Sequence, residues 1–272
     1  MNNQLILHRV WEISGYSLKD GLRLWGLPTP TSGVSTPVFN ENTIYAGTWQ
    51  EFVEKDRVGI WPEFVEMLKE NDANGDSLIE QDEIPKEMLL FSRPGMDKDT
   101  WYIYKIFGMM DIDKNGLVDE AEWTKQMNWA KSLYEESGLL AFELSGNGEL
   151  SSSLIKWKIS EQVPEVPSPI YYKGFVYIIK NGGIITCVDA EGGEVLYRER
   201  LGVSGPYIAS PIVANGNIYV PSNNGVITVI EAGNQLKILA KNDLDEKIYA
   251  SPAVIGNVIY VRTAGNLYAF GK

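Results

Sequence analysis

The sequence predicts a mainly β protein with one α-helical insertion, and three observations predict this fold class. Short apolar strands separated by Gly and Asn turns recur at a nearly fixed period near the N-terminus and after residue 138. Between residues 51 and 137 the apolar residues instead recur at helical spacing. That segment holds 21 Asp and Glu against 10 Lys and Arg, whereas the rest of the chain carries 15 acidic and 14 basic groups. We therefore expect an N-terminal β part at 1–50, a helical insertion at 51–137 and a C-terminal β part at 138–272.

Three Ser-Pro pairs mark the β repeat. They begin at Ser168, Ser210 and Ser251, so the two intervals between them are nearly equal. Each unit continues as a short apolar run, a Gly or Asn turn, a strand, a second turn and another strand, and the first two units add a fourth strand at 194–200 and 235–241. A period of about 40 to 45 residues with four strands per unit is typical of a β-propeller blade, which buries its faces against neighbouring blades.

The N-terminal β part is predicted to contain an incomplete blade and then an interrupted one. Thr36 opens a unit whose second strand is Thr43–Gly47, and the matching next strand resumes only at Gly138–Phe142. The interval from Thr36 to Ser168 is close to one repeat plus the length of the 51–137 segment. We therefore expect a partial or open β-propeller of about five four-stranded blades, the terminal ones incomplete, with the insertion in a strand-to-strand loop of one blade. Unpaired strand edges at the ends of such an arc would invite association.

Two dodecamers in the insertion place oxygen-bearing groups at matching positions. Residues 72–83 read DANGDSLIEQDE and residues 111–122 read DIDKNGLVDEAE. Positions 1, 3, 5, 9 and 12 carry carboxylate or amide oxygens, position 7 offers a backbone carbonyl, and position 8 is apolar. The candidate metal ligands are Asp72, Asn74, Asp76, Leu78, Glu80 and Glu83 in the first loop, and Asp111, Asp113, Asn115, Leu117, Asp119 and Glu122 in the second.

Both dodecamers resemble the EF-hand loop, and the resemblance implies a helical EF-hand pair with two Ca²⁺ sites. In that family the position-12 glutamate, here Glu83 or Glu122, binds the ion through both oxygens. Solvated acidic turns are the alternative interpretation. Position 6 is Gly116 in the second loop but Ser77 in the first, and a side chain held at positive φ costs on the order of 1 kcal/mol. We therefore expect the first loop to bind more weakly.

The spacing of the two loops suits a face-to-face pair. They begin at Asp72 and Asp111, and their position-8 residues Ile79 and Val118 are expected to make a short β contact. On the flanks, Pro62 is expected to open the helix before the first loop. The residues between Ile103 and Met110 are expected to form the helix before the second.

The β units resemble the PQQ-like repeat family. The resemblance rests on Val188–Gly193 followed by the strand 194–197, and on Gly15–Gly21 followed by Leu24 and Trp25. It implies blade-docking roles for Trp11, Trp25 and Trp157, and a periplasmic or extracellular location for a full-length parent. The N-terminal segment MNNQLILHRVWEISGY shows no signal peptide, so the chain itself leaves the compartment open.

The residue types in this sequence give little support for a catalytic function. Quinoprotein dehydrogenases of the PQQ-like fold use a vicinal disulfide, and this chain has one cysteine, Cys187. His8 is the only histidine, so neither a zinc cluster nor a Ser-His-Asp triad can be built around it. We name no catalytic residue and expect no PQQ. The main hypothesis is a calcium-binding, non-enzymatic β-propeller that acts as an interaction or scaffold protein. The alternative is a fragment of a PQQ-dependent quinoprotein-like oxidoreductase, so the enzyme question stays open here.

Charge and hydropathy limit the classes of partner that the protein is expected to bind. The acidic balance, −12 overall, argues against nucleic acid and anionic membranes as partners. No continuous apolar run reaches the length of about 18 residues that a membrane-spanning helix requires, so we expect no transmembrane segment. Another protein or a carbohydrate is the expected partner.

Overall fold

The computed structural model describes residues 4–31, 33–50, 61–91 and 100–271. Contacts within the chain divide it into two compact units. The first, which we call the β unit, comprises residues 1–50 and 137–272, and the second, the helical unit, comprises residues 51–136. Each unit is described by itself.

The described residues of the β unit form five sheets, antiparallel except for one short strand in the first, and we number them in chain order. Three neighbouring strands form the first sheet: β1 (Gln4–Arg9), β2 (Glu12–Ser17) and β3 (Arg23–Pro28). The second contains β4 (Val38–Asn40), β5 (Thr43–Thr48), β8 (Gly138–Glu143) and β10 (Ile155–Ile159). The third contains β11 (Ile170–Tyr172), β12 (Phe175–Lys180), β13 (Ile184–Asp189) and β14 (Val195–Arg200). The fourth contains β15 (Ile212–Ala214), β16 (Asn217–Pro221), β17 (Val226–Glu231) and β18 (Ile238–Asp243). The fifth contains β19 (Ala253–Ile255), β20 (Val258–Arg262) and β21 (Leu267–Gly271).

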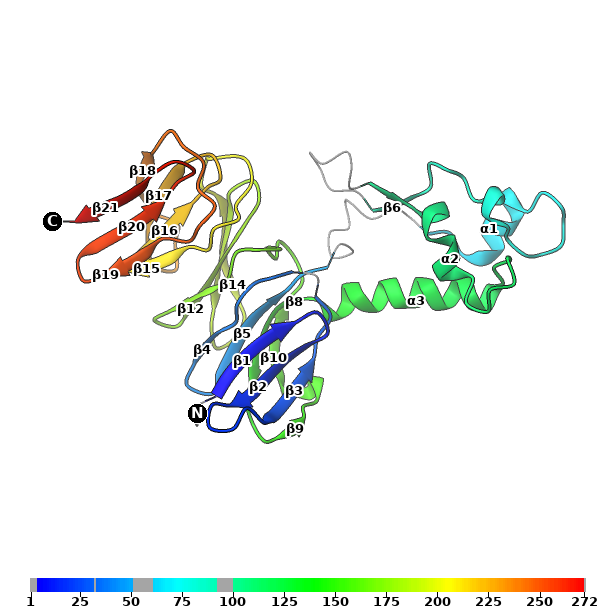
Figure 1. Cartoon of the computed structure of the whole chain (residues 1–272), viewed down its shortest axis with the longest axis horizontal. Helices are drawn as coiled ribbons and strands as arrows, with labels where there is room; N and C mark the ends of the chain where they lie inside the picture. The colour runs from blue at the N-terminus through cyan, green and yellow to red at the C-terminus, as the bar shows by residue number, and fades with distance from the viewer. Residues whose placement is uncertain (1–3, 32, 51–60, 92–99, 272) are drawn as a thin grey trace. The chain divides into compact units, whose positions relative to one another are not determined.

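The predicted mainly β class and the four-stranded units are confirmed, and no sheet among the described residues closes on itself. The predicted fourth strands at 194–200 and 235–241 correspond to β14 and β18. One strand was not predicted. The two-residue β9 (Gly148–Glu149) pairs in parallel with β3 and gives the first sheet its fourth member. In Figure 1 the green strands β8, β9 and β10 lie beside blue strands, whereas colour otherwise runs in order through the sheets.

The hairpins that open the third and fourth sheets are formed by residues with positive φ. Lys173 and Gly174 have φ of 46° and 85°, and Asn215 and Gly216 have φ of 51° and 79°. Two successive positive φ values define the turn whose twist matches that of antiparallel strands, and glycine adopts such values without strain. The turn residues therefore fix the strand register that brings each apolar run onto its neighbour.

A ladder of hydrogen bonds connects successive sheets at the Ser-Pro motif. The amide of Thr36 donates to the hydroxyl oxygen of Ser168 at 2.9 Å, Ser168 donates likewise to Ser210 at 3.0 Å, and Ser210 to Ser251 at 2.9 Å. The separations along the chain are 132, 42 and 41 residues. The last two are single repeat distances, and the first is close to one repeat plus the length of the insertion. The repeat in the sequence therefore corresponds to a series of hydrogen bonds between successive sheets, and we call this series the serine ladder.

The inner sheets bury both faces. In β12, Val176 and Ile178 pack against the second sheet, whereas Tyr177 and Ile179 pack against the fourth. Successive residues of a strand point to opposite faces, so a strand covered on both sides must be apolar throughout. This is why the strands were recognisable as short continuous apolar runs.

The tryptophans predicted to dock blades behave differently from one another. The indole nitrogen of Trp157, in the second sheet, donates to the carbonyl of Ala190 in the third at 3.1 Å. A Cβ on Gly193 would lie 2.5 Å from the Trp157 ring, so that glycine is needed for the close approach. Trp25 is buried and packs towards the second sheet. The expectation for Trp11 was wrong, because that residue follows β1 in a tight turn and is 59% exposed.

The helical unit is inserted between two paired strands. β5 and β8 pair from Thr43 opposite Glu143 to Thr48 opposite Gly138. At the last pair, the Thr48 hydroxyl donates to the Gly138 carbonyl at 2.9 Å, and the Gly138 amide lies 2.8 Å from the same hydroxyl oxygen. The ends of the insertion therefore lie close together, as predicted.

Short helices and one long helix build the helical unit. Its described elements are α1 (Phe64–Asn71), a 3-10 helix (Gln81–Glu83), β6 (Leu89–Phe91), β7 (Trp101–Tyr102), a second 3-10 helix (Ile103–Ile106), α2 (Phe107–Met110) and α3 (Glu120–Glu136). Its core gathers Met67, Ile79, Ile103, Met110 and Trp123, which are fully buried.

Two local predictions for this unit need correction. α1 begins at Phe64 with Glu63 as its capping residue, so Pro62 lies before the helix and not in its first turn. The segment from Ile103 to Met110 is a 3-10 turn followed by a single α turn, although its apolar residues are buried as expected. Packing against the unit's core explains their spacing without a continuous helix.

Candidate metal centre

The second loop lies between the end of α2 and the start of α3. It brings together one oxygen each from Asp111, Asp113 and Glu122, all within 4.8 Å of one another. Asp111 and Glu122 are buried, at 6% and 9% exposure, while Asp113 is exposed. Two buried carboxylates beside a third form a concentrated negative site, which is the arrangement that a hard cation neutralises.

Backbone amides hold these carboxylates in place. Gly116 donates to Asp111 at 3.0 Å, and Asn115 donates to Asp113 at 3.0 Å. Glu122 reaches back across the loop and accepts the amide of Ile112 at 2.7 Å and that of Asp119 at 3.2 Å. Each bond uses part of an oxygen's accepting capacity and orients the carboxylate, because a carboxylate oxygen can accept more than one partner.

The turn of the loop depends on positive φ. Gly116 has φ of 90°, and Lys114 has φ of 63°. The Lys114 ammonium donates to the carbonyl of Asp111 at 2.7 Å and also to that of Gly108. Lys114 lies at a loop position for which the ligand spacing predicts no role, and its side chain connects the loop to the end of α2.

The first loop repeats the same bonding scheme. Ser77 donates its amide to Asp72 at 3.0 Å, as Gly116 does to Asp111 in the second loop. Glu83 accepts the amides of Ala73 at 2.7 Å and Glu80 at 2.9 Å. The positions that correspond by sequence therefore correspond in hydrogen bonding, including the position-12 glutamates.

The two loops differ in how tightly their carboxylates gather. Among the described residues, three carboxylates come within 4.8 Å in the second loop but not in the first. In both loops the side-chain amide of the asparagine donates to a nearby aspartate, from Asn74 to Asp76 at 3.1 Å and from Asn115 to Asp113 at 2.9 Å. The pKa of Glu80 is raised, first by desolvation and then by the charges of Asp82, Glu83 and Asp76.

A short β contact joins the loops. Ile79 and Val118 form an isolated antiparallel bridge, with the Ile79 amide donating at 3.0 Å and the Val118 amide at 2.9 Å. Both side chains are fully buried, so the predicted contact is confirmed. The amides of Leu78 and Leu117 bond to Asp76 and Asn115 at 2.9 and 2.8 Å, and the ligand role of their carbonyls stays a prediction.

Ser77 has the positive φ, 65°, that the sequence predicted. We expect Ser77→Gly to tighten cation binding at the first loop by about fivefold, because glycine removes strain on the order of 1 kcal/mol. The matched control is Gly116→Ser, which should weaken the second loop by a similar factor. A Cβ on Gly116 would have no neighbour within 4 Å, so strain acts there without a clash. Calcium titration of both variants checks the pair, and unchanged affinities would contradict the strain argument.

The fold and the loops together define a β-propeller-type repeat protein with a pair of acidic loops inserted in one blade. Residues 135–269 match a family model described as outer membrane protein assembly factor BamB, so this part of the chain is similar to the repeats of that family. No curated protein matches the chain.

Solved structures extend the similarity in fold. The β-propeller domain of Cps50 (Swd1) from Myceliophteria thermophila is similar over 98% of this chain and 66% of its own, with a TM-score of 0.51 and 12% identity. BamB from Moraxella catarrhalis has a TM-score of 0.40 and 17% identity over 49% of this chain. Quinohemoprotein alcohol dehydrogenase from Comamonas testosteroni has a TM-score of 0.31 and 14% identity over 37%. The chain spans 39% of the BamB chain and 17% of the dehydrogenase.

In the part of the chain that the structure describes, no helix is both long and apolar enough to cross a bilayer.

Proposed function

We propose that this protein is a calcium-binding, non-enzymatic β-propeller repeat protein that presents its blades to another protein. Loops 72–83 and 111–122 would each bind one Ca²⁺. The observation that carries the proposal is the gathering of Asp111, Asp113 and Glu122, with their oxygens held by loop amides in a scheme that the first loop repeats.

The donor chemistry fits calcium. Every candidate ligand offers oxygen, and each loop supplies four carboxylates. Ca²⁺ accepts six to eight oxygen ligands in flexible geometry, whereas Mg²⁺ demands a small, regular octahedron and retains its waters. Bound Ca²⁺ would supply positive charge only. The side chains of this chain would orient around it, and α3, which begins at Glu120, would be anchored at its first turn.

The repeats support the scaffold part of the proposal. The family that matches residues 135–269 is described as an outer membrane protein assembly factor. That description favours a protein partner and a periplasmic or outer-membrane-associated location. A carbohydrate partner has no comparable support.

The alternative, a quinoprotein-like oxidoreductase, has weaker support. Cys187 is buried, and burial raises the pKa of its thiol to about 12, so it stays protonated at neutral pH. Trp25 and Trp157 are engaged in packing between sheets. The Nδ1–H of His8 donates to the carbonyl of Ser35, 2.9 Å away, and burial lowers the pKa of His8.

Calorimetry of the full chain tests the calcium sites. We expect two sites, with dissociation constants between about 10⁻⁷ and 10⁻³ M and the second loop tighter. No heat at millimolar calcium would disprove the proposal. A parallel titration with PQQ is expected to show no binding, and a bound quinone would favour the oxidoreductase.

A further inference from the structure

A lysine at position 4 distinguishes the second candidate loop from the first. The ammonium of Lys114 donates to the carbonyl of Asp111 at 2.7 Å and to that of Gly108. Gly108 belongs to α2 and Asp111 caps its end, so the side chain connects the turn of the loop to the helix before it. The last carbonyls of a helix have no partner within the helix, and a lysine can donate to them. The same position in the first loop is Gly75, which has no side chain to make this contact.

The residue that Lys114 contacts is the one that holds the turn. The carboxylate of Asp111 accepts the amide of Asn115 at 3.1 Å and that of Gly116 at 3.0 Å. Lys114 bonds to the backbone of Asp111, while the side chain of Asp111 bonds to the backbone of the turn. Asp111 is also buried, at 6% exposure. Its carboxylate is therefore oriented by contacts within the chain itself.

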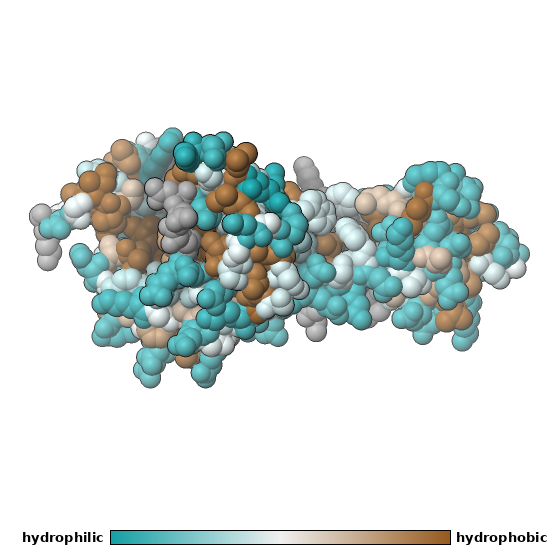
Figure 2. Space-filling view, turned by 90° about the horizontal axis from the view of Figure 1, so that it is seen from below, coloured by the Kyte–Doolittle hydropathy of each residue, from teal (hydrophilic) through white to brown (hydrophobic). Residues whose placement is uncertain are grey.

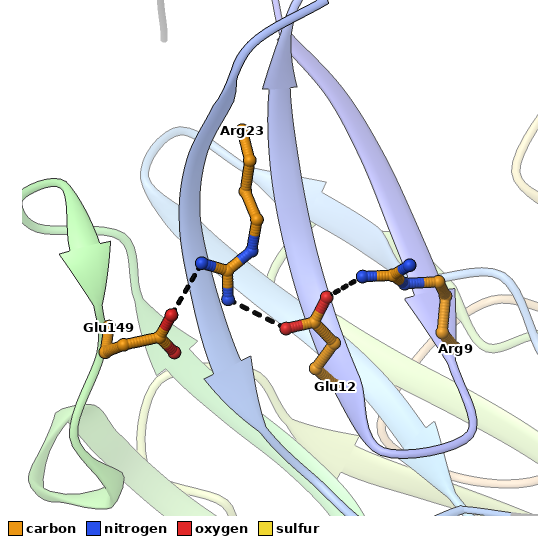
Figure 3. Close-up of polar contacts among 4 residues, drawn as sticks. All are labelled: Arg9, Glu12, Arg23 and Glu149. Carbon is orange, nitrogen blue, oxygen red and sulfur yellow. Dashed lines mark hydrogen bonds and ion pairs between the residues drawn. The ribbon is translucent and has the colours of Figure 1, made fainter.

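The simplest role for a lysine in this unit would be to pair with a carboxylate. The insertion holds 21 acidic and 10 basic residues, and the helical unit, on the right of Figure 2, shows a largely hydrophilic face. In the first sheet of the β unit, cations do pair in this way. Arg9 bonds to Glu12, and Arg23 bonds to Glu12 at 2.8 Å and to Glu149 at 2.6 Å (Figure 3). Among the described residues, the Lys114 ammonium has no carboxylate partner and bonds to carbonyls instead.

Two opposite effects on cation binding follow from this arrangement. The positive charge of the ammonium repels a cation held by the carboxylates of the loop. Its hydrogen bonds keep the loop in one shape, so that less conformational freedom is lost when the ion binds. Lys114 is exposed, so water and salt screen the repulsion, whereas the hydrogen bonds act directly on the candidate ligand Asp111. The ordering of the loop is therefore the larger effect.

We propose that Lys114 is a positioning residue that holds the second loop in its cation-binding shape before the ion arrives. The inference rests on the proposed calcium site of that loop. It gives the two loops different behaviour, because the first loop has Gly75 at this position and is less firmly ordered without the ion. The tighter gathering of carboxylates in the second loop agrees with this difference.

Calcium titration of three variants by calorimetry tests the effect on affinity. Each also carries Glu83→Gln, which removes a candidate ligand of the first loop, so that the heat reports on the second. Lys114→Met should weaken binding by about 10-fold, at the low end of the range for residues that support metal ligands. Lys114→Arg should bind like the chain with Glu83→Gln alone, because a guanidinium also donates to carbonyls.

The matched control is Lys125→Met, which removes the same charge from an exposed residue of α3 close to the loop in the chain. Without a role in ordering the loop, it should leave calcium affinity unchanged or slightly higher. Repulsion alone predicts that Lys114→Met also binds calcium more tightly. Unchanged or higher affinity in Lys114→Met would therefore overturn the proposal.

Hydrogen exchange of the calcium-free full chain gives a second readout, which does not depend on the ion. The amide of Gly116 should exchange more slowly than that of Ser77, its counterpart in the first loop. Lys114→Met should accelerate exchange at Gly116 and leave Ser77 unchanged. Equal acceleration in both loops would indicate a general loss of stability and overturn the proposal. If the unchanged chain bound no calcium, the calcium site itself would be disproved, and the exchange comparison would still decide whether Lys114 orders the loop.

Discussion

Glu122→Gln is expected to weaken calcium binding at the second loop by about 100-fold or more. Even changes to residues that only support metal ligands cost about 10- to 100-fold in affinity. Glu122 is buried, and its two oxygens already span the loop from the amide of Ile112 to that of Asp119. A neutral amide would present one oxygen and one NH₂ group, which cannot bind a cation and would clash with one of those amides.

The matched control is Glu120→Gln. Glu120 is exposed at the start of α3, close to Glu122 in the chain, and occupies a loop position that carries no ligand. The Glu120→Gln substitution changes the net charge by the same amount as Glu122→Gln, so an effect of overall charge on calcium binding would be equal in the two variants. Calorimetry should show the second site lost in Glu122→Gln and retained in Glu120→Gln. Equal losses in both would show that overall charge, rather than ligation, binds the ion.

Removal of residues 51–137, with Asn-Gly inserted between Gln50 and Gly138, is expected to leave the β unit folded. The helical unit has its own core around Met67, Ile103 and Trp123, and none of the cores between sheets includes its described residues. β5 and β8 remain paired up to Thr48 and Gly138, and Asn-Gly favours a tight hairpin. The deletion also removes the Ser137 hydroxyl, which bonds to the Pro30 carbonyl at 3.4 Å, a weak contact.

Circular dichroism checks the deletion and the matching effect of calcium. The shortened chain should retain its strand signal and unfold cooperatively. In the full chain, a chelator should reduce the helical signal and leave the strand signal, because an ion stabilises only the structure that holds it, by about 2.7 kcal/mol at 100 times its dissociation constant. Loss of strand signal in step with the helical signal would show that the units fold together.

The blades could be predicted because their determinants are local. Turns such as Asn215-Gly216 and the continuous apolar run of β12 can be recognised from a few residues, and the Ser-Pro spacing joined them into a period. The pairing of β5 with β8 followed from the same period, although Thr48 and Gly138 are 90 residues apart in the chain.

The features that the sequence did not predict correctly depend on contacts between residues that are distant in the chain. β9 has two residues, Gly148 and Glu149, and becomes a strand only because β3 lies beside it. The continuous helix expected before the second loop shortens to a 3-10 turn and one α turn, with Gly108 within that α turn. Glycine lowers helix stability by about 1 kcal/mol relative to alanine, and the core holds the neighbouring apolar residues in either conformation.

The candidate site was predictable in composition but not in geometry. Spacing alone identified the candidate ligands and the positive φ at Ser77. It did not predict that carboxylates would gather more tightly in the second loop, because that depends on the burial of Asp111 and Glu122.

The serine ladder bears on how a gene for such a protein can lengthen. A segment that runs from one Ser-Pro pair to the next encodes one donor amide and one acceptor hydroxyl. Tandem duplication of that segment by recombination would add one blade and one rung, with every amide and hydroxyl of the series still paired. A duplication shorter than one repeat that omits the Ser-Pro pair would add chain without adding a rung. Growth by whole blades is therefore the tolerated mutational step, and the length of the repeat, rather than its endpoints, defines that step.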